Sequence, residues 1–135
     1  MVNHKPWEIV SEVLKLVSAT VAVGLTTQEL NDIGEKIILE LGGIPYNKGY
    51  QPKWAKTPFP TALCIAINDE IAHGIPSGRI LQDGDLVSFD VGVKKDGLCG
   101  DGAITIGVGN ISNRNERLLR YTKQTLMEGI KIVKA

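Results

Sequence analysis

Residues 85–106, DLVSFDVGVKKDGLCGDGAITI, have the pattern of a β-hairpin. Apolar side chains alternate with small or polar ones over residues 87–93, which is typical of a strand with one face in a core. Residues 98–106 form a second β-like run, and the Asp96-Gly97 pair between the runs is a strong signal for a tight turn. The two runs are therefore expected to pair as an antiparallel sheet.

Each strand of this hairpin carries one aspartate, Asp90 in the first and Asp101 in the second. Cross-strand neighbours share a face of a sheet, so the length of the turn decides whether the two carboxylates meet. A turn with an even number of residues places both on one face, whereas an odd turn separates them. Two carboxylates on one face repel each other, and a divalent cation relieves that repulsion. The spacing alone also fits aspartates that cap turns or pair with a distant arginine.

Three further motifs surround the aspartates. Asn68-x-x-x-x-His73-Gly-Ile-Pro76 precedes the hairpin, Leu81-x-x-Gly84-Asp85 leads into it, and Asp101-x-Ala-x-Thr105 lies in its second strand. Together they resemble the type I methionine aminopeptidases over nearly the whole chain. The His-Gly-Ile-Pro form favours that type over type II and over prolidase-like relatives. The resemblance implies an α+β fold, namely half of a pita-bread fold, in which an antiparallel sheet is backed by two or three helices.

The resemblance also implies an activity, the metal-dependent removal of the initiator methionine from a peptide or nascent chain. Asp90 and Asp101 correspond to ligands of two divalent metal ions, which could be manganese, iron, cobalt or zinc. His73 corresponds to a catalytic histidine that contacts the substrate. Cys64 and Phe59 correspond to the pocket for the methionine side chain, where a thiol and an aromatic ring suit a thioether. Without the resemblance, His73 fits a loop or core histidine, and Cys64 fits a buried strand residue equally well.

The family's second half supplies a metal-binding histidine, two metal-binding glutamates and a second catalytic histidine. These have no counterparts here, because the two histidines precede the hairpin and the acids after Asp101 fall in one predicted helix (His4, His73, Glu116 and Glu128). We therefore expect residues 1–135 to form a single domain that corresponds to the N-terminal half, with residues 113–134 as the helix that would begin the second half. We expect such a truncated chain to bind metal weakly and to have little or no catalytic activity.

Two other functions stay open at this point. A non-catalytic half-domain could bind a protein partner, although it would need none of His73, Asp90 and Asp101. A homodimer could rebuild a metal site from the aspartates of both chains. Docking of a separate C-terminal half is a further possible partnership.

The sequence predicts helices on either side of this region. Pro6 favours the first turn of a helix that runs to about Val21, and Thr26-Thr-Gln-Glu29 has the spacing of a capping box for a second helix. Asn113-x-x-Glu116 predicts the start of a third helix, whose apolar stripe needs a partner. Residues 51–60, rich in proline and lysine, predict a loop that is longer than the family's connection there, with Trp54 as its anchor or as a lid.

The composition narrows the classes of function and the cellular compartments that remain possible. Fifteen basic and fifteen acidic residues balance, so no charge pattern favours binding to nucleic acid. Cys64 and Cys99 lie in predicted buried strands and are expected to be free thiols in a reducing compartment. The N-terminus lacks the order of a signal peptide, and polar residues interrupt the apolar stretch 14–25. We therefore expect a cytoplasmic protein with no membrane partner.

Overall fold

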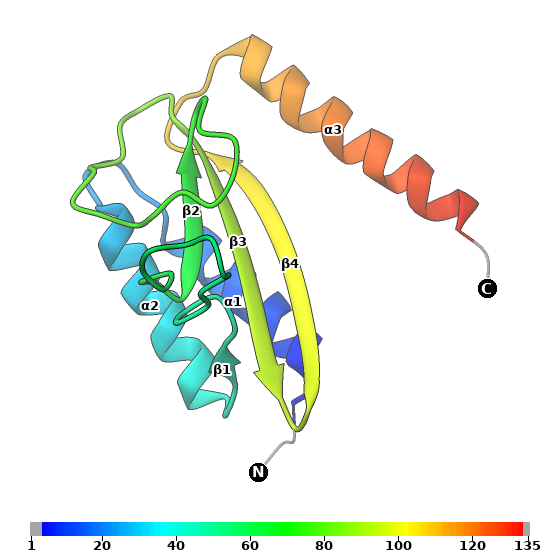
Figure 1. The fold of residues 1–135 in the computed structure, drawn as a ribbon. Helices are drawn as coiled ribbons and strands as arrows, with labels where there is room; N and C mark the ends of the chain where they lie inside the picture. The colour runs from blue at the N-terminus through cyan, green and yellow to red at the C-terminus, as the bar shows by residue number, and fades with distance from the viewer. Residues whose placement is uncertain (1–3, 134–135) are drawn as a thin grey trace.

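A computed structural model describes residues 4–133. Figure 1 shows two helices behind a twisted sheet and a third helix that extends away from it. The elements, in chain order, are α1 (Pro6–Thr20), α2 (Thr27–Glu40), β1 (Ile44–Pro45), β2 (Leu63–Ile67), β3 (Leu86–Lys95), β4 (Leu98–Gly107) and α3 (Asn113–Ile132).

The sheet is antiparallel and centred on β3. One edge of β3 pairs with β2 and, near its end, with the short β1, while the other edge pairs with β4 along its full length. The β3–β4 turn contains only Asp96 and Gly97, both with positive φ (51° and 78°), as a type I′ turn requires. The turn therefore has an even number of residues, which is the condition for Asp90 and Asp101 to share a face.

The core lies between the sheet and the helices α1 and α2 (Figure 1). Phe89 and Val91 of β3 are fully buried on this face. Helix α1 crosses β4 at two glycines, because a Cβ atom at Gly100 would lie 2.6 Å from the backbone nitrogen of Trp7, and one at Gly102 would lie 2.8 Å from Cγ1 of Val10. The small residues of β4 therefore let the helix approach the sheet closely.

The predicted helices all form. The capping box of α2 is complete, because the Thr26 hydroxyl accepts from the backbone nitrogen of Glu29 and the Glu29 carboxylate accepts from that of Thr26. Helix α3 begins at Asn113, as predicted, but its capping residue differs from the prediction. The Ser112 hydroxyl, and not Asn113, caps this helix by accepting from the backbone nitrogen of Asn115 at 3.2 Å.

Two expectations about exposure differ from the structure. Both cysteines are free, as predicted, but only Cys64 is buried, and the prediction of a buried Cys99 was wrong. Cys99 is exposed because β4 is an outer strand and its alternate residues point away from α1. Trp54 does not anchor its loop by burial, since 86% of its surface is exposed.

Helix α3 leaves the body of the protein (Figure 1), and none of its described side chains is buried. Its exposed apolar residues are Leu118, Tyr121, Leu126, Met127, Ile130 and Ile132. Within residues 4–133, no helix has both the length and the apolar character needed to cross a membrane.

Candidate active site

Cys64, Asp90 and Asp101 share the face of the sheet that α1 and α2 leave uncovered. Phe89 and Val91 point into the core, so Asp90 between them points to the opposite face. Cys64 of β2 is the direct cross-strand partner of Asp90.

The β3–β4 register brings the two carboxylates together. Asp90 lies opposite Ala103, and Asp101 lies opposite Gly92, so the two aspartates are diagonal neighbours on one face. Oδ2 of Asp101 lies 3.3 Å from the position that a Cβ atom at Gly92 would occupy. The Asp101 carboxylate therefore extends over β3, into space that Gly92 leaves free.

The electrostatics of Asp90 agree with this proximity. Burial raises the pKa of Asp90 above its ordinary value, and the negative charge of Asp101 raises it further. The neighbouring His73 acts in the opposite direction and lowers the pKa of Asp90. All three groups therefore lie within electrostatic reach of one another.

Cys64 belongs to the same cluster. Burial raises the pKa of the Cys64 thiol to about 11, and the charges of Asp90 and Asp101 contribute to the rise. The side-chain amide of Asn47 donates to Sγ of Cys64 at 3.6 Å. Cys64 is thus a neutral thiol beside two acids, which suits contact with an apolar ligand better than nucleophilic attack.

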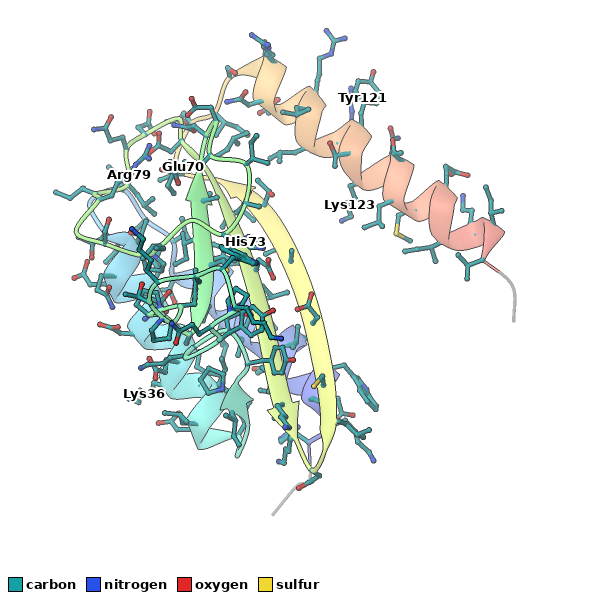
Figure 2. All side chains as sticks on the ribbon, in the orientation of Figure 1. Lys36, Glu70, His73, Arg79, Tyr121 and Lys123 are labelled. Atoms are coloured by element: carbon teal, nitrogen blue, oxygen red, sulfur yellow. The ribbon has the colours of Figure 1, made fainter. Side chains whose placement is uncertain are left out.

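His73 reaches this face from a segment that returns along β2. The backbone nitrogen of Ile65 donates to the carbonyl oxygen of Gly74 at 2.9 Å, and a Cβ atom at Gly74 would collide with the carbonyl oxygen of Ile65. His73 itself has a φ of 54°, in the left-handed region that few residues other than glycine adopt. Figure 2 shows His73 in front of the sheet, on the side away from α1.

Asn68 and Asp85 of the sequence motifs hold this region together. The side-chain amide of Asn68 donates to Oδ1 of Asp85 at 2.8 Å and accepts from the backbone nitrogen of Leu86 at 2.9 Å. Glu70 adds a second clamp, because it accepts from the backbone nitrogen of Ile67 and forms an ion pair with Arg79 (Figure 2). These hydrogen bonds and this ion pair stabilise the segment around His73, and none of them involves Asp90 or Asp101.

A cavity of about 510 Å³ opens beside the cluster. Phe59, Cys64 and His73 all line it, so the structure brings the predicted pocket residues and the predicted catalytic histidine to one cavity. Tyr46, Asn47, Tyr50 and Trp54 also line this cavity. Sequence reasoning missed Tyr46 and Asn47, because the two-residue strand β1 that positions them has no detectable β pattern.

The donor set fits a divalent cation in part. Carboxylate oxygens are the ligands that hard and borderline cations prefer, and Asp90 and Asp101 present theirs as diagonal neighbours on one face of the sheet. Residues 4–133 contain no cluster of three or more histidine, cysteine, aspartate or glutamate side chains arranged for a metal ion. The chain therefore offers two carboxylates to a metal.

The chain is similar in sequence and in fold to several bacterial methionine aminopeptidases. Methionine aminopeptidase 1 of Bacillus subtilis is 41% identical over 111 residues, which make up 82% of this chain and 42% of that protein. The methionine aminopeptidase of Clostridium perfringens is 41% identical over 127 residues, which make up 94% of this chain and 49% of that protein. The crystal structure of methionine aminopeptidase from Thermotoga maritima matches with a TM-score of 0.88 and 32% identity, over 96% of this chain and 50% of that one.

These matches confirm the α+β architecture as half of a pita-bread fold and the resemblance to methionine aminopeptidases. The chain spans about half the length of the relatives that it matches. The model of metallopeptidase family M24 matches residues 5–135, from the start of α1 to beyond α3. The chain therefore belongs to metallopeptidase family M24.

Proposed function

We propose that this chain forms the N-terminal half of a metal-dependent aminopeptidase site that removes an N-terminal methionine from peptides. One observation carries the proposal: Cys64, His73, Asp90 and Asp101 meet on one face of the sheet, beside a cavity. A nascent chain is the substrate class that this activity implies, and it would place the protein in the cytoplasm.

In this proposal Asp90 and Asp101 hold the metal. When bound, a divalent cation supplies Lewis-acid chemistry for attack on a carbonyl group. His73 lines the adjacent cavity, and in this proposal it donates a hydrogen bond to the oxygen on which charge develops. Phe59 and the neutral Cys64 thiol take up the thioether side chain.

Two carboxylates leave most coordination positions of a metal to water, so we expect weak metal binding and little or no turnover by this chain alone. Because the chain spans about half the length of its relatives, we propose that the remaining ligands lie in a part that corresponds to their other half. Helix α3, with its exposed apolar side chains, would then begin that half.

Metal titration of Asp90→Asn tests the proposal. Manganese binding by isothermal titration calorimetry is expected for the wild-type chain and should be lost in Asp90→Asn. Asp96→Asn is the matched control, because it removes the same charge from the same hairpin and leaves an Asn-Gly pair that suits a type I′ turn. Equal manganese affinity in the wild type and in Asp90→Asn would refute the assignment of Asp90.

Light scattering and a methionyl-peptide cleavage assay on the same samples separate the remaining possibilities. An active dimer would show that two copies rebuild a site. A chain that binds a protein partner but neither manganese nor a methionyl peptide would favour the non-catalytic half-domain.

A further inference from the structure

Residues 51–58 form a closed loop beside the candidate site. At its base, the backbone nitrogen of Gly49 donates to the carbonyl oxygen of Phe59 at 2.8 Å. Inside the loop, the backbone nitrogen of Ala55 donates to the carbonyl oxygen of Pro52 at 2.9 Å. Proline fixes the backbone φ angle, so Pro52 restricts the loop further. The loop therefore has a defined shape without a ligand.

This loop forms one wall of the cavity that contains Cys64 and His73. The loop residues that line the cavity are Pro52, Trp54, Ala55, Thr57 and Pro58. At about 510 Å³, the cavity falls within the range of roughly 300–1,000 Å³ that is typical of pockets for drug-sized ligands, which are larger than one methionine residue. The cavity therefore has room for more of a peptide than its first residue.

Trp54 is the aromatic side chain of this wall. It lines the cavity, yet 86% of its surface is open to water. Cys64, at the sheet, is only 5% exposed, so the cavity runs from a buried end beside the aspartates to an open end at Trp54. Covering an exposed indole with a ligand removes apolar surface from water and therefore favours binding. Tryptophan is also enriched among the residues that dominate binding energy.

We propose that Trp54 is a specificity-determining residue that contacts the peptide beyond its second residue and favours an apolar or aromatic side chain there. This inference rests on the proposed function, in which Cys64 and Phe59 hold the first side chain at the buried end. The peptide then continues toward the open end, where the preformed loop presents the indole. Because the loop is already ordered, little conformational entropy is lost when the peptide binds.

The test compares a short and a longer ligand in the presence of manganese. Methionine amide reaches only the buried end, whereas methionyl-alanyl-phenylalanine amide extends to the loop. Dissociation constants are measured by NMR titration for the wild type, Trp54→Ala, Trp54→Tyr and the control Trp7→Ala. Trp7 is also an exposed tryptophan, but it lies on α1, on the other face of the sheet.

Trp54→Ala is expected to weaken binding of the tripeptide about tenfold and to leave binding of methionine amide unchanged within about twofold. Trp54→Tyr should restore most of the tripeptide affinity, and Trp7→Ala should change neither ligand. If Trp54→Ala binds the tripeptide as well as the wild type does, or loses both ligands equally, Trp54 is not a specificity residue although the proposed function stands. If the wild type binds neither ligand, the proposed function fails, and the role of Trp54 fails with it.

Discussion

Replacing Gly74 with alanine is expected to detach the His73 segment from β2. The added Cβ atom would collide with the carbonyl oxygen of Ile65, which belongs to the backbone of a buried strand and cannot turn away as a side chain can. The segment must therefore move outward, and the hydrogen bond from the backbone nitrogen of Ile65 to the carbonyl oxygen of Gly74 must break.

The expected fall in the free energy of unfolding follows from the loss of that hydrogen bond. A typical backbone hydrogen bond contributes about 1 kcal/mol net, and a buried donor left without a partner costs about 1–3 kcal/mol. Ile65 is 1% exposed, so water does not readily replace the lost acceptor. The free energy of unfolding should fall by about 2–3 kcal/mol. With a urea m-value of about 2 kcal/mol/M, the midpoint of unfolding should fall by about 1 M.

Gly78→Ala is the matched control, since it makes the same change four residues later. No atom lies within 4 Å of a Cβ atom at Gly78, so its effect should stay within about 0.5 kcal/mol. Urea unfolding gives the stability of both variants, and the NMR shifts of the His73 ring report whether the imidazole has moved. Equal urea midpoints for Gly74→Ala and Gly78→Ala would refute the argument from close approach.

Two further predictions concern the core and the helix cap. Phe89→Ala should lower the free energy of unfolding by about 3–5 kcal/mol, because the ring is fully buried, whereas Ile104→Ala on the outer strand, 40% exposed, should cost clearly less by urea unfolding. Hydrogen bonds from the backbone N–H of Thr26 and, after it, from its hydroxyl lower the pKa of Glu29. The stability that this carboxylate contributes is therefore fully present above its unfolded-state pKa, and it is lost as the pH falls through its folded-state pKa. Glu29→Gln should therefore lose less thermal stability between pH 7 and pH 3 than the wild type does, and an equal loss would contradict this linkage.

The sequence predicted those parts of the site that local patterns determine. The Asp96-Gly97 pair signals a two-residue turn, and strand alternation then places Asp90 and Asp101 on one face. The sequence could not show that Asp101 extends over Gly92, because the free space at Gly92 exists only once two strands lie side by side.

The parts that were missed depend on contacts between distant segments. Asn47 reaches Cys64 because β1 pairs with the end of β3 through only two residues, which leaves no periodic signal. Cys99 was expected in the core because its strand looks apolar, yet no element covers that face of β4 beside it. Strand alternation shows which residues share a face, but burial also depends on what packs against that face.

The position of the candidate site is set by the opposite face of the same strand. Phe89 and Val91 are fully buried against the helices, while Asp90 between them faces the site. A slip of β3 by one residue would expose both apolar side chains and place Asp90 in the core, and each of these changes costs several kcal/mol. Burial and, after it, the negative charge of Asp101 raise the pKa of Asp90, so the two like charges oppose the observed register, but burial of the apolar face outweighs their repulsion. The hydrophobic core therefore holds the two carboxylates together before any cation neutralises them.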